Sequence, residues 1–346
     1  MINTAIIGFG LSGKVFHAPF IHTHQSFKLA KVVERNSGHS KSIYPEVEIV
    51  RDYKLLLDDP AIELVVICTP NIYHFEMARA CLEAGKHIII EKPFMPTVQE
   101  ANEIIELANT KDLKVFVYQN RRWDGDFLTI NKLLKSNLIG DIQSFEAHFD
   151  RFSPERKRAA WRDEVLPGSG ILYDLGSHLI DQVLCLFGMP DMLKADIQLQ
   201  RPGSKVDDFF EIELIYPELK AIVTAGMLVE NPDLRYVING SKGTYVKYGI
   251  DPQETALKNG FMPDGEEWGK ETFENRGLTT FIKNDLCFDG SVETESGNYM
   301  AFYENVHNVL NQNAEIAVKP EEARDVIRII ELAIESNAKK EMIKHP

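Results

Sequence analysis

The chain has 346 residues, of which 44% are hydrophobic and 26% charged, a composition that is typical of folded globular proteins and excludes wholesale disorder. This length favours two domains over one core. The formal net charge of −14 argues against non-specific binding to nucleic acid or to anionic membranes, because both require clustered positive charge.

The four cysteines lie far apart, with no CxxC pair and no histidine at metal-ligand spacing. This pattern disfavours a disulfide scaffold and a structural zinc site, and no metal is predicted. The chain enters a strand directly, without a secretory leader, and no apolar run approaches the roughly 18 residues of a membrane span. We therefore expect reduced thiols in a cytoplasmic protein.

The first third of the chain alternates short apolar runs with helical stretches. Strands are predicted over residues 4–7, 27–33, 64–68, 87–90 and 115–118, with the clearest helices over 75–84 and 98–109. Several runs are apolar at consecutive positions, which is typical of strands buried on both faces of a parallel sheet. An α/β domain with a doubly wound parallel sheet is therefore expected over residues 1–120.

The pattern changes beyond residue 120. The order is a helix over 127–135, a strand over 142–150, a helix over 172–187, period-2 segments over 195–200, 208–216, 221–228 and 235–239, and a last helix over 321–338. Period-2 segments separated by turn residues indicate a largely antiparallel sheet with one packed and one wetter face. We expect one α+β domain over residues 121–346, whose C-terminal helix is a candidate to pack back onto the first domain.

A glycine-rich motif directly follows the first strand: Gly8, Phe9, Gly10, Leu11, Ser12 and Gly13. In this context GxGxxG is the fingerprint of a Rossmann dinucleotide site, where glycines allow a tight turn and close approach to the pyrophosphate. Glu34 follows 21 residues after Gly13, about where an acidic group reaches the adenosine ribose. An S-adenosylmethionine binder, or a glycine turn without ligand, would carry the same motif.

Two neighbouring residues give opposite indications of the cofactor. A carboxylate at Glu34 favours NAD, because it binds ribose hydroxyls and repels a 2′-phosphate. The guanidinium of Arg35 favours NADP, because it pairs well with phosphate. NAD(P) is predicted, with the choice between the two left open.

Further candidates follow the next strands of the predicted sheet. Glu91 and Lys92 come directly after the strand at 87–90, where ligands of open α/β sheets bind, so Lys92 can stabilise charge on a reacting oxygen. A solvated lysine before a turn would look the same. After the preceding strand come four candidate cofactor contacts: Thr69, Pro70, Asn71 and His74.

On the helix predicted over 172–187, Asp174, His178 and Asp181 share one face at i, i+4 and i+7. A histidine beside a carboxylate can act as a general base. A metal site, or a structural histidine, is the alternative. Two cation–aromatic clusters are further candidates near the site: Asn120, Arg121, Arg122 and Trp123, and Trp161 with Arg162. The basic run 156–158 fits a solvated loop, or a phosphate contact.

Together, the GFGLSG, EKP and GSGILYDLGSHLIDQ motifs resemble the Gfo/Idh/MocA family of NAD(P)-dependent oxidoreductases over essentially the whole chain. The segments NRRWDGDFLTI, AAWRDE and SKGTYVKYGIDPQE are most similar to the branch of bacterial scyllo-inositol 2-dehydrogenases that use NADP. That branch often carries small or hydroxyl residues where Glu34 stands.

The resemblance implies roles for individual residues. Lys92 matches the catalytic lysine, with a cis bond to Pro93; His178 matches the acid/base histidine, and Asp174 the carboxylate that holds substrate hydroxyls. Trp161 and Arg162 match a pair near the nicotinamide. Substrate contacts are expected from Lys92, Asn120, Arg122, Asp174 and His178. The second domain would have an open-faced sheet used to form a homodimer or homotetramer.

Three functions are compatible with these residues. The first is a dehydrogenase that transfers hydride between NAD(P) and a secondary hydroxyl of a cyclitol or sugar. The second is a glycosidase that uses NAD for transient oxidation, a chemistry found on the same fold. The third is a non-catalytic dinucleotide-binding regulator, which would need neither Lys92 nor His178. We therefore place the dehydrogenase first, with a small polyol or sugar as its partner.

Overall fold

The computed structural model describes residues 1–155, 164–231 and 233–345 and divides the chain into two compact units. Unit 1 comprises Met1–Asn120, Gln253–Trp268 and Asn298–Arg324, and unit 2 comprises Arg121–Pro252, Gly269–Gly297 and Asp325–Pro346. The first break between the two units falls after residue 120. Two later segments return to unit 1, which the local sequence pattern does not reveal because it carries no information on long-range contacts.

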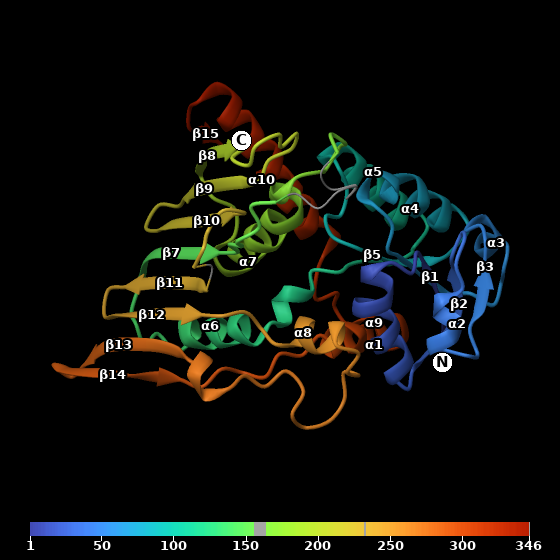
Figure 1. Cartoon of the computed structure of the whole chain (residues 1–346), viewed down its shortest axis with the longest axis horizontal. Helices are drawn as coiled ribbons and strands as arrows, with labels where there is room; N and C mark the ends of the chain where they lie inside the picture. The colour runs from blue at the N-terminus through green and yellow to red at the C-terminus, as the bar shows by residue number, and fades with distance from the viewer. Residues whose placement is uncertain (156–163, 232, 346) are drawn as a thin grey trace. The chain divides into compact units, whose positions relative to one another are not determined.

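Unit 1 contains a six-stranded sheet in the order β3-β2-β1-β4-β5-β6. Its strands, all parallel to their neighbours, are β1 Ile2–Ile7, β2 Phe27–Val33, β3 Glu48–Val50, β4 Leu64–Ile67, β5 His87–Ile90 and β6 Val115–Val117. Strands β1, β2, β3 and β5 of this sheet are labelled in Figure 1. Every side chain of β4 is buried, which explains its run of consecutive apolar residues.

The helices of unit 1 connect these strands or return from later in the chain. They are α1 Ala18–Thr23, α2 His39–Ile43, α3 Lys54–Leu57, α4 His74–Glu83, α5 Val98–Thr110, α8 Gln253–Lys258 and α9 Met300–Gln312. Thr97 caps α5 by accepting a hydrogen bond from the backbone N–H of Glu100. Between β1 and α1 lies a five-residue π-helix, η1 Gly13–His17.

Unit 2 contains a nine-stranded sheet in the order β14-β13-β12-β11-β7-β10-β9-β8-β15 (Figure 1). Only the β7–β10 pair is parallel within it. Its strands are β7 Ile142–His148, β8 Met192–Gln198, β9 Phe209–Ile215, β10 Lys220–Gly226, β11 Leu234–Gly240, β12 Gly243–Tyr248, β13 Gly277–Lys283, β14 Leu286–Val292 and β15 Ile343–Lys344.

One face of this sheet is packed and the other is open. On β9, Phe210, Ile212 and Leu214 are fully buried, whereas Glu211 between them is exposed. The helices of unit 2 are α6 Gly125–Lys135, the π-helix η5 Leu172–Gly176 and α7 Ser177–Phe187, and α7 packs on β10. The expected fold class, a parallel sheet followed by an open-faced and mostly antiparallel one, is confirmed.

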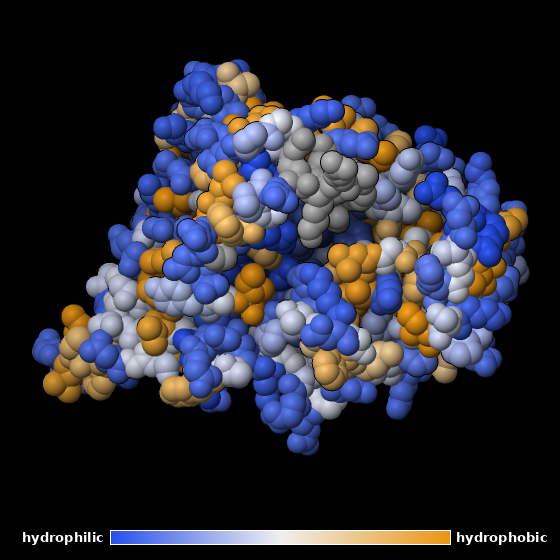
Figure 2. Space-filling model, viewed as in Figure 1, coloured by the Kyte–Doolittle hydropathy of each residue, from blue (hydrophilic) through white to orange (hydrophobic). Residues whose placement is uncertain are grey.

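The last long helix, α10 Pro320–Lys339, begins in unit 1 and belongs to unit 2 from Asp325 onward. There, the Ser336 hydroxyl accepts a hydrogen bond from the backbone N–H of Ala195 on β8. The sequence pattern missed α9 and the β13–β14 hairpin. Strand β14 is exposed almost throughout, so it lacks the apolar alternation by which strands are recognised. Figure 2 shows apolar side chains at the hairpin tip, where Ile282 and Leu286 are exposed.

Candidate active site

The glycine-rich turn leads from β1 into η1. Gly8 has φ +96°, a left-handed conformation that favours glycine, and a Cβ there would lie 3.0 Å from the Cys68 carbonyl oxygen. A Cβ on Gly13 would lie 2.2 Å from the Gly8 carbonyl oxygen, whereas a Cβ on Gly10 would meet nothing within 4 Å. The turn thus packs tightly at two glycines and leaves open space at the third, which fits the close approach of a pyrophosphate.

The other predicted cofactor residues follow the neighbouring strands. Thr69, Pro70 and Asn71 come after β4, and Glu91 and Lys92 come after β5. Strands β1, β4 and β5 are adjacent and parallel, so their carboxyl ends lie along one edge of the sheet. Unit 1 therefore brings these residues together with the glycine-rich turn, at the edge where open α/β sheets bind ligands.

A buried histidine holds one side of the turn that carries Lys92. The ring nitrogens of His74 lie 3.0 Å from the Thr69 carbonyl oxygen and 3.1 Å from that of Pro93. Burial lowers the pKa of His74, so its imidazole is neutral at neutral pH. The Lys92–Pro93 bond is cis, as the resemblance implied. His74 therefore joins the ends of β4 and β5, a structural contact beside the predicted cofactor edge.

The carboxylate of Glu91 holds the other side of this turn. One of its oxygens accepts a hydrogen bond from the Ser12 hydroxyl and lies 3.0 Å from Nε2 of His17, and the other accepts from the backbone N–H of Lys92. Burial raises the pKa of Glu91, but the contacts with His17 and Ser12 outweigh it and bring this pKa below its usual value. Glu91 is therefore an ionised carboxylate.

Glu34 faces inward. Its carboxylate, 4% exposed as a residue, accepts hydrogen bonds from the Ser37 and Ser40 hydroxyls and from the backbone N–H groups of His39 and Ser40. Burial raises the pKa of Glu34, and these hydrogen bonds more than offset it, so this pKa lies below its usual value. The carboxylate thus caps the first turn of α2.

Arg35, next to Glu34, is exposed. A second guanidinium, Arg51, donates hydrogen bonds to the carbonyl oxygens of Glu34 and Ser37. The loop after β2 therefore has its acidic group enclosed and two basic groups close by. The sequence alone left the orientation of these side chains open.

In unit 2, the predicted acid/base residues occupy the start of one helical segment. Asp174 lies in the π-helix η5 and His178 in the first turn of α7. A single α-helix was expected over this stretch, and the π-turn at its start differs from that expectation. Such turns occur often at functional sites. His178 is 5% exposed, and Asp174 is more accessible.

The third acidic residue of this face has a different partner. Asp181 forms a two-pronged ion pair with Arg122, at 2.8 Å from Nε and 2.7 Å from Nη2. This ion pair engages both oxygens of the Asp181 carboxylate and holds the side chain of Arg122, a predicted substrate contact, in place. Outside the gaps at 156–163, 232 and 346, no cluster of three or more His, Cys, Asp or Glu side chains could hold a metal ion.

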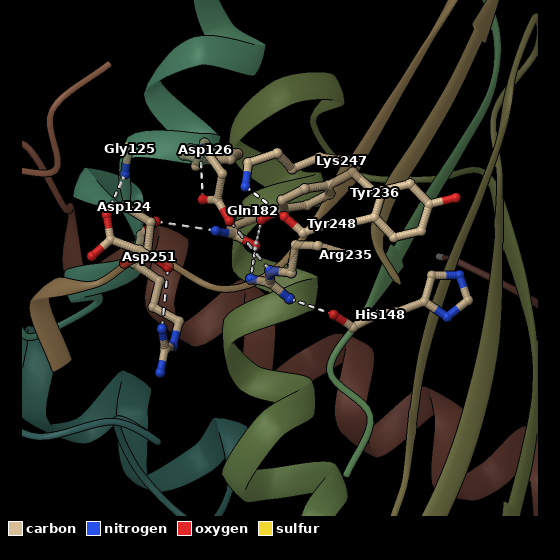
Figure 3. A network of polar contacts seen from close by, with 12 residues as sticks. Asp124, Gly125, Asp126, His148, Gln182, Arg235, Tyr236, Lys247, Tyr248 and Asp251 are labelled. Atoms are coloured by element: carbon tan, nitrogen blue, oxygen red, sulfur yellow. Dashed lines mark hydrogen bonds and ion pairs between the residues drawn. The ribbon is translucent and has the colours of Figure 1, made fainter. Parts of the chain in front are cut away.

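A buried polar network anchors α7 to the sheet (Figure 3). The side-chain oxygen of Gln182 accepts hydrogen bonds from Tyr236, at 2.8 Å, and from Arg235, at 3.4 Å, while its amide nitrogen donates to the Arg121 carbonyl oxygen. Arg235 lies 3.5 Å from the Asp126 carboxylate. Sequence reasoning missed this network because its members come from residue 121, α6, α7 and β11 and share no local motif.

Lys92 and Asn120 belong to unit 1, whereas Arg122, Asp174 and His178 belong to unit 2. The predicted Trp161 and Arg162, and the basic run 156–158, lie outside the described residues. Of the glycine-rich motif, Phe9 is half-buried and Leu11 is exposed. In the described part of the chain, no helix is long and apolar enough to span a bilayer.

Both the N-terminal and the C-terminal part of the chain match models of a known protein family. Residues 2–119 match a family model described as an oxidoreductase family with an NAD-binding Rossmann fold. Residues 131–344 match the model of the C-terminal alpha/beta domain of the same oxidoreductase family, Gfo/Idh/MocA.

Individual relatives align over nearly the whole chain. The scyllo-inositol 2-dehydrogenase (NADP(+)) IolW of Bacillus subtilis is 38% identical, with 99% of this chain and 95% of that protein covered. The uncharacterized oxidoreductase YdgJ of Escherichia coli is 41% identical, with 97% and 96% covered.

Among solved structures, yvaA from Bacillus subtilis matches with a TM-score of 0.96 and 37% identity, covering 100% of this chain and 99% of that one. The Rossmann sheet, the motifs at its carboxyl edge and two family models that together span most of the sequence agree. The chain belongs to the Gfo/Idh/MocA family of oxidoreductases.

Proposed function

We propose that this oxidoreductase is an NAD(P)-dependent dehydrogenase that oxidises a secondary hydroxyl of a cyclitol or sugar. The observation that carries the proposal is the position of Lys92, directly after β5 and beside the glycine-rich turn that follows β1. A cation at this edge is suited to an oxygen that gains negative charge. The name of the relative IolW, a scyllo-inositol 2-dehydrogenase, supports a cyclitol.

In this reaction a bound nicotinamide supplies the acceptor for the hydride that leaves the substrate carbon. His178 takes the hydroxyl proton as the carbon–oxygen double bond forms. The Lys92 ammonium group stabilises the negative charge on that oxygen, and Asp174 orients a neighbouring hydroxyl. The reverse reaction returns the same proton from His178.

We infer that NADP is the preferred cofactor. The Glu34 carboxylate, with all four of its hydrogen bonds from residues 37–40, is poorly disposed to bind a ribose 2′-hydroxyl. Arg35 follows β2, and Arg51 follows β3 and donates a hydrogen bond to the Glu34 carbonyl oxygen, so two positive charges lie near this loop. Guanidinium groups pair well with phosphate. The relative IolW carries NADP in its name.

The test is an absorbance screen for reduced nicotinamide, with NAD and NADP each supplied to inositols, aldoses and sugar acids. We expect accumulation of NADPH with at least one inositol. The Lys92→Ala and His178→Ala variants should still bind dinucleotide and should lose at least 100-fold in kcat. Wild-type turnover by Lys92→Ala, or turnover of glycosides without net NADPH, would contradict the proposal.

A further inference from the structure

A line of buried side chains in unit 1 ends at the residue before Lys92 and has no part in the chemistry proposed above. The Tyr303 hydroxyl lies 2.6 Å from Nδ1 of His17, and Nε2 of His17 lies 3.0 Å from the Glu91 carboxylate. The same carboxylate oxygen accepts the Ser12 hydroxyl. His17 and Tyr303 are both fully buried, so water does not replace either contact.

The protons along this line can be assigned from its ends. Burial raises the pKa of Tyr303 well above its usual value, so its hydroxyl keeps its proton beside Nδ1 of His17. An ionised carboxylate has no hydrogen to donate, so the hydrogen in the contact between His17 and Glu91 lies on Nε2 of the imidazole. His17 therefore donates from Nε2 to the ionised Glu91.

The position of His17 is itself fixed by packing from distant parts of the chain. It ends the π-helix η1, and its ring centroid lies 4.3 Å from that of Tyr118, which directly follows β6. Tyr303 comes from α9, 286 residues further along the chain. The imidazole is thus held between elements that the Rossmann strands alone would not bring together.

We propose that His17 is a positioning residue, which acts through Glu91 to hold the glycine-rich turn and the Lys92 backbone in one arrangement. Glu91 contacts both segments. One of its carboxylate oxygens accepts a hydrogen bond from the Ser12 hydroxyl in the turn, and the other accepts one from the backbone N–H of Lys92. Binding of the dinucleotide and placement of the lysine are then coupled. This inference rests on the proposed function, since it assumes that Lys92 acts on the substrate.

The test compares two substitutions that differ in which ring nitrogen they replace. The amide nitrogen of His17→Gln reaches the place of Nε2 and keeps the donor to Glu91, whereas that of His17→Asn reaches only the place of Nδ1. We expect His17→Asn to lower kcat/KM and weaken NADPH binding by about 10-fold or more, and His17→Gln to stay within about threefold of wild type. NADPH binding is followed by fluorescence titration of the full chain without substrate.

A pH profile of NADPH binding separates positioning from a merely structural role. The titratable and charged groups that face Glu91 are His17, Lys92, Cys68, His74 and Tyr303. Loss of the His17 donor removes the strongest influence that keeps the pKa of Glu91 low. The acidic limb of the binding profile should therefore move to higher pH in His17→Asn and stay in place in His17→Gln.

Tyr303→Phe gives a second test that deletes one hydroxyl only, with Tyr299→Phe as a control in the same aromatic cluster. Tyr303→Phe leaves Nε2 of His17 as the donor to Glu91, so it should shift the acidic limb less than His17→Asn does, and Tyr299→Phe should not shift it. Equal losses in His17→Asn and His17→Gln, or an acidic limb that stays in place in His17→Asn, overturn the inference. An inactive Lys92→Ala beside a fully active His17→Asn overturns this inference alone, whereas an active Lys92→Ala overturns the proposed function.

Discussion

Arg35 is the residue that most directly tests the inferred preference for NADP. Its side chain is exposed, while the carboxylate of Glu34 beside it is enclosed by residues 37–40. A charge-assisted hydrogen bond to phosphate contributes about 1.5–3 kcal/mol. Arg35→Ala should therefore raise the KM for NADP about 10-fold or more and leave that for NAD within about twofold, as measured by initial rates with each cofactor.

The control for this substitution is Arg79→Ala, which removes another exposed arginine of unit 1, one paired with Glu83 on α4. It should leave both KM values unchanged. An equal rise in KM for NAD and NADP in Arg35→Ala would show that the residue does not discriminate between them.

Asp207 is a second residue that leads to a prediction, here on how the stability of the fold depends on pH. Its carboxylate accepts a hydrogen bond from the backbone N–H of Leu172 at 2.7 Å, at the start of the π-helix that carries Asp174. Burial raises the pKa of Asp207 from an ordinary value of 3.8 to about 6. The folded state therefore binds a proton more tightly than the unfolded state does.

The pH dependence follows from this difference. Between about pH 4 and pH 6 the folded chain holds a proton that the unfolded chain has lost, so raising the pH through this range lowers the free energy of unfolding. Asp207→Asn keeps an oxygen acceptor and removes the titration. The free energy of unfolding of Asp207→Asn, relative to that of wild type, should rise across this range by at most about 3 kcal/mol. Chemical denaturation at pH 4.5, 6 and 7.5 measures this difference. A constant difference would contradict the assignment.

At the scale of elements, two glycines of the glycine-rich turn have different roles, one in binding and the other in folding. A Cβ on Gly10 meets open space, whereas a Cβ on Gly13 would clash with the backbone of Gly8. Gly10→Ala should change the free energy of unfolding by less than about 1 kcal/mol and weaken NADPH binding at least about 10-fold. Gly13→Ala should destabilise unit 1 by about 1–3 kcal/mol even without cofactor.

Thermal unfolding and fluorescence titration distinguish these two outcomes. Gly85→Ala is a useful comparison, because Gly85 has open space around it but a φ of +77°. It should reduce stability through backbone strain and leave NADPH binding intact. Tight NADPH binding by Gly10→Ala would show that this turn does not approach the pyrophosphate.

Elements with strong local patterns were predicted closely. The apolar runs gave β2 and β5 with the observed limits, and the alternation of residues 208–216 gave β9 within one residue at each end. Elements without such patterns were missed. Strand β3 has only three residues, and β14 has no buried face, so neither produces a periodic signal.

At the scale of the whole molecule, the open face of the nine-stranded sheet bears on assembly. A row of side chains crosses neighbouring strands of this face. In order along the row they are Leu278, Val246, Val237, Glu146 and Ile222. None of the four apolar side chains is fully buried. Exposed apolar patches on soluble proteins mark interaction sites, and we propose that a second copy of the chain covers this one.

Val237→Glu tests this proposal by placing a charge in the middle of the row. We expect it to convert the oligomer to monomers in sedimentation velocity experiments, because burial of an unpaired charge opposes association. Gln143→Glu, an exposed position on β7, is the control and should leave the assembly unchanged. A monomeric wild-type chain at micromolar concentration would contradict the proposal.

The sequence by itself determined the class of fold and the family, and it singled out the candidate residues. These depend on local features: strand periodicity, the spacing of the glycines in residues 8–13, and the residues that follow each strand. Lys92 could be singled out because its place after a buried strand is a local property. The same holds for His178, which shares a helical segment with Asp174.

Only the tertiary structure decided what each polar side chain contacts. It turned Glu34 inward, paired Arg122 with Asp181, and joined His17 to Tyr303 across 286 residues of sequence. These outcomes depend on which buried donors and acceptors find partners, since an unsatisfied polar group costs free energy in the interior. Which groups become partners depends on contacts between distant parts of the folded chain, so no local pattern of residues predicts them.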